Sequence, residues 1–111
     1  MPKAKAKPVL THVTYRPKKG RERELFALVK KHWPTLRKTG LVTAKAATVY
    51  RAHDKRSGAD YFIEIFSWRD EQASGIAHQT PAVMAIWEPM GPIMEGMEIA
   101  ALQPVGAKPR R

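Results

Sequence analysis

The segment Tyr61-Phe-Ile-Glu-Ile-Phe-Ser-Trp68 is the most strand-like stretch of the chain. It is dominated by aromatic and β-branched residues, which are typical of a pleated and partly buried surface. Successive side chains of a strand point to opposite faces, so Phe62, Glu64 and Phe66 share one face with Trp68. Both faces are mainly apolar, which indicates that both are covered in the native protein.

Similar segments occur on either side of this strand. Alternation of apolar and polar residues predicts further strands at 9–16, 47–53 and 97–102. Apolar residues at three- and four-residue spacings predict helices at 21–38 and 70–94. The resulting order, βαββαβ, predicts a ferredoxin-like α+β fold with an antiparallel sheet. The two helices can cover one face of that sheet, and the uncovered face predicts a second subunit.

Proline and glycine mark the expected interruptions of the helices. Pro34 lacks the amide hydrogen of an unbroken helix, which predicts a kink or restart at Trp33. Thr80 and Pro81 predict a break in the second helix, with Thr80 as the N-cap of the restarted part. The helix is then expected to end before a turn at 93–96, at three helix-breaking residues: Pro89, Gly91 and Pro92.

The composition limits the class of protein. A chain of 111 residues with 43% hydrophobic and 27% charged residues is typical of one globular domain, expected here at 9–103. The absence of cysteine excludes disulfides, thiolate metal sites and cysteine nucleophiles. The N-terminus lacks the apolar part of a secretory signal, and no apolar run approaches the roughly 18 residues of a membrane span. We therefore expect a cytoplasmic protein without a membrane partner.

The net charge of +10 is concentrated in two tails, residues 1–8 and 104–111. The tails contain six of the 20 basic residues: Lys3, Lys5, Lys7, Lys108, Arg110 and Arg111. The other 14 basic residues face 10 acidic ones, a net charge of about +4. Lysine alternating with alanine and proline predicts disordered, solubilising tails. Basic tails can also hold phosphates, but the strands lack the aromatic-basic pattern of RNA-binding domains, so a nucleic-acid partner is disfavoured.

Residues 61–73, followed by His78-Gln-Thr-Pro81 and a helix with methionine and tryptophan, resemble the antibiotic-biosynthesis-monooxygenase-like domain of the dimeric α/β-barrel superfamily. The resemblance covers residues 9–102. It implies a homodimer in which two ferredoxin-like sheets pack face to face, and a pocket between the sheet and helices of each subunit. The superfamily includes cofactor-independent oxygenases, haem-degrading enzymes and isomerases. The iron-ligating histidine of the haem-degrading branch falls near Trp87, so haem degradation by that route is not expected.

Three polar residues are candidates for catalysis. His78 lies at the helix break, beside the expected mouth of the pocket. His12 lies in an alternating strand and could take a proton from a ligand near neutral pH. Glu64 lies in an apolar strand, where burial would make a carboxylate a stronger base. The alternative for Glu64 is a cross-strand ion pair with Arg51 or Lys45.

Aromatic and methionine side chains are candidates for the walls of a pocket for a flat ring, with core packing as the alternative. They are Tyr50, Phe66, Trp68, Trp87 and Met84. His32 and His53 are expected at the surface. No histidine pair has the spacing of a HExxH site, so no metal is expected, and no motif indicates a nucleotide cofactor or a serine nucleophile.

The leading hypothesis is a cofactor-independent monooxygenase-like protein that acts on a small, flat hydrophobic or aromatic molecule. In such chemistry the substrate supplies electrons to oxygen, and the protein deprotonates and orients it. One alternative is a non-catalytic, small-molecule-binding or stress-related dimer of the same fold. A less favoured alternative is a basic accessory protein that contacts nucleic acid through its tails.

Overall fold

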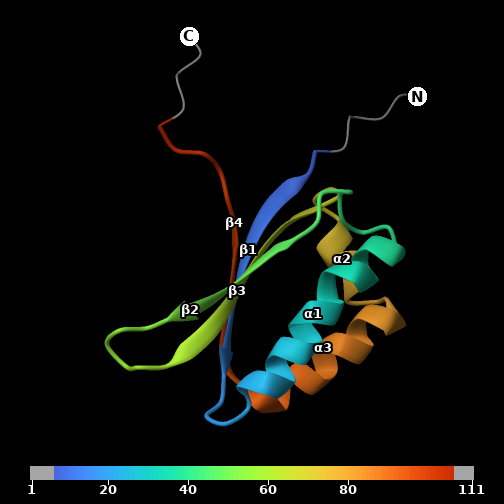
Figure 1. Cartoon of the computed structure of the whole chain (residues 1–111). Helices are drawn as coiled ribbons and strands as arrows, with labels where there is room; N and C mark the ends of the chain where they lie inside the picture. The colour runs from blue at the N-terminus through green and yellow to red at the C-terminus, as the bar shows by residue number, and fades with distance from the viewer. Residues whose placement is uncertain (1–6, 107–111) are drawn as a thin grey trace, which may run out of the picture.

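The computed structural model describes residues 7–106, in which four antiparallel strands form one sheet (Figure 1). The strands are β1 (Val9–Pro17), β2 (Thr48–His53), β3 (Asp60–Trp68) and β4 (Met94–Ala101), in the order β2-β3-β1-β4. The helices are α1 (Glu22–Lys38), α2 (Ala73–Ala77) and α3 (Pro81–Ile93). With α2 and α3 together in the second helical position, the order is βαββαβ, and the predicted ferredoxin-like α+β fold is confirmed. The predicted tails lie largely outside the described residues and stay predictions.

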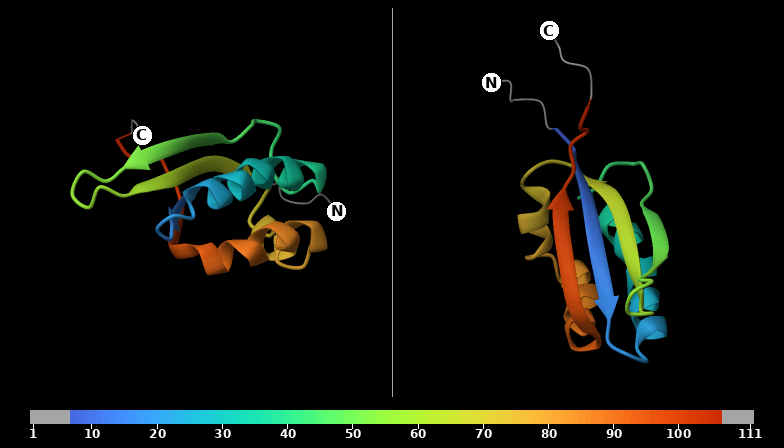
Figure 2. Two further views of the ribbon diagram at one scale, coloured as in Figure 1. Left: turned by 60° about the horizontal axis from the view of Figure 1, so that its bottom comes forward. Right: turned by 90° about the vertical axis from the view of Figure 1, so that its left-hand side faces the viewer.

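The helices cover one face of the sheet and leave the other face open (Figure 2). α1 and α3 lie side by side on the covered face, and the core fills the space between them and the strands. The buried side chains of α1 recur at positions 25, 29, 32 and 36, which is one stripe of the helix. On β3 they recur at every second residue from Phe62 to Trp68. The periodic apolar positions of α1 and β3 therefore face each other across the core.

Both helices continue through their prolines. α1 is unbroken from Glu22 to Lys38, so the predicted restart at Trp33 is wrong. α3 likewise continues through Pro89 and Pro92 to Ile93, and β4 begins at the next residue without the predicted turn at 93–96. All three internal prolines lie on exposed positions, while the opposite side of each helix is buried. The packed stripe therefore keeps each helix continuous despite a missing backbone hydrogen bond.

The open face of the sheet is substantially apolar. Leu10 and Tyr50 are exposed on it, and Ile63 and Ile65 are half-buried. The register places these residues on one face, because Leu10 pairs with Ser67 and Tyr50 pairs with Ile63. An apolar face of this kind supports the prediction of a second subunit.

Candidate functional site

A cavity of about 510 Å³ lies on the covered side of the sheet, between the strands and the helices. This volume lies within the range of small-molecule sites. Its walls are mostly apolar and come from β1, β3, β4 and α3, with residues that include Val13, Phe66, Trp68, Met90, Met94 and Ile99. An apolar, pre-formed space of this size suits a small hydrophobic ligand.

Four side chains from four different elements form a buried hydrogen-bonded network on the cavity wall. The Tyr15 hydroxyl of β1 donates to Oε1 of Glu64 on β3, at 2.6 Å. Nδ1 of His32, on α1, lies 2.8 Å from the same oxygen. The Trp87 indole of α3 donates from Nε1 to Nε2 of His32, also at 2.8 Å. Tyr15, His32 and Trp87 line the cavity, whereas Glu64 is fully buried and does not.

The network defines the protonation of His32. An indole nitrogen can only donate, so Nε2 of His32 must accept and carries no hydrogen. A neutral imidazole then has its proton on Nδ1, which donates it to Glu64. Tyr15 and His32 thus aim two donors at one carboxylate oxygen, and the 3.2 Å contact between the Tyr15 hydroxyl and Nδ1 joins neighbouring donors. Glu64 is therefore the common acceptor that holds both side chains in place.

Tyr15 is held in its protonated form. Burial raises the pKa of its hydroxyl well above the usual value, and the negative charge and hydrogen bond of Glu64 raise it further. A phenol that keeps its proton remains a donor to Glu64 throughout the neutral range. Tyr15 accordingly acts as a hydrogen-bond donor to the Glu64 carboxylate and not as a base.

His78 occupies a more open part of the same cavity. It is the C-cap residue of α2, and its Nδ1 lies 2.9 Å from the carbonyl oxygen of Ser74. A carbonyl only accepts, so Nδ1 carries the hydrogen and Nε2 of neutral His78 has a free lone pair. The ring meets Trp87 edge to face, with centroids 4.8 Å apart. His78 is exposed and lines the cavity, so a proton acceptor stands where the cavity meets solvent.

The structure brings only some of the predicted site residues to the cavity. His78, Phe66, Trp68 and Trp87 line it. The other four predicted residues, His12, Glu64, Tyr50 and Met84, are not among the lining residues, although Glu64 belongs to the hydrogen-bonded network on the cavity wall. His12 and Tyr50 lie on the open face of the sheet, paired with Ile65 and Ile63.

Two predictions about polar residues are wrong. The ion pair of Glu64 with Arg51 or Lys45 does not form, because Glu64 faces the helices and Arg51 instead contacts Asp60, at 3.5 Å. His32 is not a surface residue, since only 3% of it is exposed. The signal was present in the sequence: position 32 is three residues after Val29 and four before Leu36, so it belongs to the buried stripe of α1.

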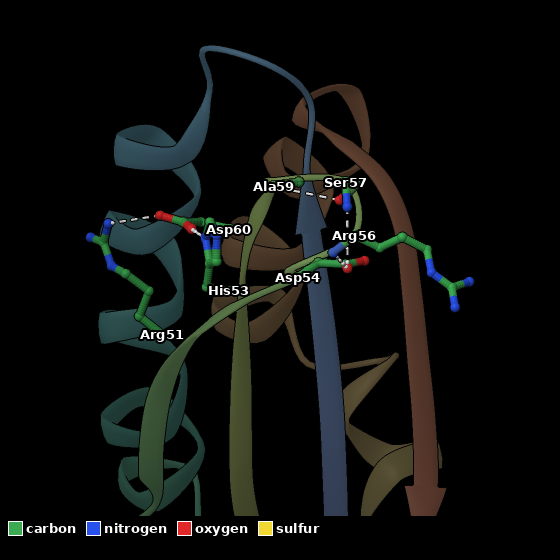
Figure 3. A network of polar contacts seen from close by, with 7 residues as sticks. All are labelled: Arg51, His53, Asp54, Arg56, Ser57, Ala59 and Asp60. Carbon is green, nitrogen blue, oxygen red and sulfur yellow. Dashed lines mark hydrogen bonds and ion pairs between the residues drawn. The ribbon is translucent and has the colours of Figure 1, made fainter.

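A second histidine–carboxylate contact occurs in the hairpin between β2 and β3 (Figure 3). His53 Nδ1 lies 2.7 Å from Oδ1 of Asp60, and the other Asp60 oxygen faces Arg51. The adjoining turn is organised by Asp54, whose side chain accepts from the backbone amides of Arg56 and Ser57. The prediction that His53 lies at the surface is confirmed. These groups stabilise an exposed turn and line no part of the cavity.

Residues 7–106 contain neither a metal-binding cluster nor a membrane-spanning helix. In that part of the chain, no group of three or more histidine, aspartate or glutamate side chains is placed to hold a metal ion. None of the helices described there is both long enough and apolar enough to cross a membrane.

Solved structures with this fold include oxygenases. The chain is similar to SnoaB, a cofactor-independent oxygenase from Streptomyces nogalater, with 15% identity and a TM-score of 0.68 over 95% of this chain and 100% of that one. It is similar to an antibiotic biosynthesis monooxygenase, with 14% identity and a TM-score of 0.67 over 87% and 98% of the two chains. A NIPSNAP family protein from Agrobacterium tumefaciens has 16% identity and a TM-score of 0.61 over 95% and 100%.

Sequence comparison alone finds no such relationship. No family model matches the chain. No curated protein matches it either. The structural likeness confirms that the chain has the fold of the antibiotic biosynthesis monooxygenases, as its sequence predicted. At these identities the likeness concerns the fold, and the chemistry has to be argued from the cavity itself.

Proposed function

We propose that the protein is a cofactor-independent monooxygenase-like enzyme that oxidises a small, flat hydroxyarene. One observation carries the proposal: an apolar cavity of about 510 Å³ is lined by flat aromatic walls and by side chains that handle protons. Phe66 and Trp68 supply aromatic surface, and Trp87 adds more beside the two histidines. Such a site would stack a planar ring and remove its hydroxyl proton.

The proposed reaction balances without a further reductant. Loss of the hydroxyl proton gives an electron-rich aryloxide, which passes electrons to dioxygen and then bonds to it at a ring carbon. Cleavage of the O–O bond leaves one oxygen atom as a second carbonyl of a quinone. The other oxygen leaves as water, with the hydroxyl hydrogen and the hydrogen of the attacked carbon. A naphthol and one dioxygen thus become a naphthoquinone and one water.

His78 would exchange the proton of this reaction with solvent. It lies at the exposed part of the cavity and has a free ring nitrogen in its neutral form. The proposal also includes a cytoplasmic homodimer formed through the open, partly apolar face of the sheet. That assembly would leave the cavity accessible, because the cavity lies on the opposite side.

Oxygen uptake with a panel of naphthols and benzenediols tests the proposal. We expect one dioxygen consumed per quinone formed, at a rate well above autoxidation without protein. His78→Gln should lower the rate at least tenfold, since a positioned acid–base group contributes about 10²–10⁴-fold. His53→Gln is the matched control, because it changes an exposed histidine outside the cavity. Tight binding of these arenes without oxygen uptake would support the non-catalytic binding protein instead.

A further inference from the structure

His32 has an unprotonated ring nitrogen, Nε2, that could act as a base but is hydrogen-bonded to Trp87. His32 lines the cavity, and the lone pair of its Nε2 accepts a hydrogen bond from the Trp87 indole at 2.8 Å. The ring is held edge-on against Phe66, with centroids 5.8 Å apart, so its orientation does not depend on Trp87 alone. Trp87 is half-buried, and both Trp87 and His32 line the cavity, so a ligand in the cavity would lie beside this pair.

Glu64 is placed to stabilise the charge that such a base would acquire. It accepts the Nδ1 hydrogen of His32 at 2.8 Å and is fully buried. Its second oxygen has no hydrogen-bond partner within the described residues, and His32 is the one basic side chain that they bring into contact with it. A proton arriving at Nε2 would therefore create an imidazolium–carboxylate pair in a medium of low dielectric constant, where the attraction is strong.

We propose that His32 is the base that removes the hydroxyl proton of the bound substrate, with Glu64 as its positioning residue and Trp87 as a donor that the substrate hydroxyl displaces. The proton moves from the substrate oxygen to Nε2 of His32. The substrate becomes an anion, and His32 becomes the cation paired with Glu64. The proposal rests on the proposed function for the substrate class, a hydroxyarene, and it assigns the removal of that substrate's hydroxyl proton to His32.

The other charged groups around the cavity do not supply this chemistry. Tyr15, on β1, keeps its proton and donates a hydrogen bond to Glu64. Asp70 lines the cavity beside Glu71, but it is paired with Arg69 at 3.0 Å. Glu71 is exposed. His78 also packs against the Trp87 ring, but it is exposed, whereas His32 is buried.

The first test reads the ionisation of a bound chromophore without using turnover. para-Nitrophenol is titrated while bound to the protein, and its phenolate absorbance is followed with pH. We expect the phenolate to persist at least one pH unit below its range in water, a tenfold change in the ratio of ionised to neutral probe. His32→Gln should abolish the shift, Glu64→Gln should shrink it, and Trp87→Phe should retain it. The matched control His53→Gln should leave it unchanged.

A second probe and a second method complete the test. para-Nitroanisole cannot donate a hydrogen bond, so it should bind at least tenfold more weakly than para-nitrophenol, and His32→Gln should remove that preference. Long-range ¹H–¹⁵N correlations of the ligand-free wild type should show His32 protonated at Nδ1 and unprotonated at Nε2. Because the NMR measurement uses the wild-type protein, it still tests the proposal if a variant fails to fold.

The outcomes separate this inference from the proposed function. The opposite tautomer, or a probe shift that survives His32→Gln, overturns the role of His32 even if oxygen uptake is observed. A His32-dependent shift without oxygen uptake supports the base and rejects the oxygenase. Equal binding of the phenol and the ether overturns the proposed ligand class.

Discussion

The protein contains two histidine–carboxylate contacts of nearly equal length in opposite surroundings. Nδ1 of His32 lies 2.8 Å from Glu64, and Nδ1 of His53 lies 2.7 Å from Asp60. The buried side chains are 3% and 0% exposed, and the hairpin side chains are 60% and 33% exposed. Contact distance is therefore a poor guide to the strength of such pairs, because the surrounding dielectric and the remaining partners decide it.

The partners of the two carboxylates differ as well. Glu64 accepts from the Tyr15 hydroxyl in addition to His32, and none of the three side chains is more than 3% exposed. Asp60 contacts Arg51 at 3.5 Å, but all three side chains of that group are partly hydrated. Loss of the buried carboxylate therefore leaves orphaned donors, whereas water can solvate the groups left by Asp60.

The largest expected effect comes from removing each carboxylate in turn. Glu64→Ala should lower the free energy of unfolding by about 3 kcal/mol, because two buried donors each lose their acceptor at about 1–3 kcal/mol. Asp60→Ala should leave the unfolding midpoint within the reproducibility of the measurement. Urea denaturation followed by tryptophan fluorescence measures both. Equal effects in the two variants would show that burial does not distinguish the pairs.

The fold was predictable because the spacing of apolar residues in the sequence specifies the order of strands and helices. A period of two residues in the strands and the spacings of the helical stripes place the elements to within a few residues of their observed bounds. The helix breaks predicted at the prolines were wrong, because a proline removes only one backbone hydrogen bond, whereas the buried stripe stabilises the whole length of the helix. Pro34, for example, removes one hydrogen bond on the exposed side of α1.

The site was only partly predictable, for two physical reasons. Alternation assigns His12 and Tyr15 to opposite faces of β1, but which face the helices cover depends on the tertiary structure. The stripe of α1 could have indicated that His32 is buried. Its partners, however, come from β1, β3 and α3, and no local pattern specifies which polar groups meet when these elements pack. The aromatic walls were easier to find, because large apolar residues on a buried strand line whatever space it bounds.

The pH dependence of stability at alkaline pH tests the buried Glu64 network through its other member, Tyr15. Its pKa is raised in the folded protein, whereas a tyrosine in the unfolded chain ionises near pH 10. Above that pH the unfolded chain has lost a proton that the native state keeps, so stability falls as pH rises toward the raised pKa. The slope for this one group is about 1.4 kcal/mol per pH unit.

Tyr15→Phe should remove that slope, and Tyr50→Phe, which changes an exposed tyrosine, should retain it. Urea denaturation at a series of alkaline pH values gives the slope for each protein. A wild-type slope that Tyr15→Phe does not alter would mean that Tyr15 ionises equally in both states.

The smallest expected effect belongs to the hairpin pair. The hydrogen bond from His53 lowers the pKa of Asp60; partial burial opposes that shift, and the charges of His53 and Arg51 add to it. A carboxylate whose pKa is lowered on folding stabilises the protein above its unfolded pKa, and that stability is lost as pH falls through the lowered folded value. Asp60→Asn should therefore remove a weak acid-side slope in thermal melts. In 1 M salt, where the Debye length is about 3 Å, the slope of the wild type should shrink, because the charges of His53 and Arg51 are open to screening ions. The alkaline slope of Tyr15 should persist at that salt concentration, since Glu64 and Tyr15 are shielded from the ions. If both slopes respond equally to salt, the two carboxylates share one electrostatic environment and the contrast between them fails.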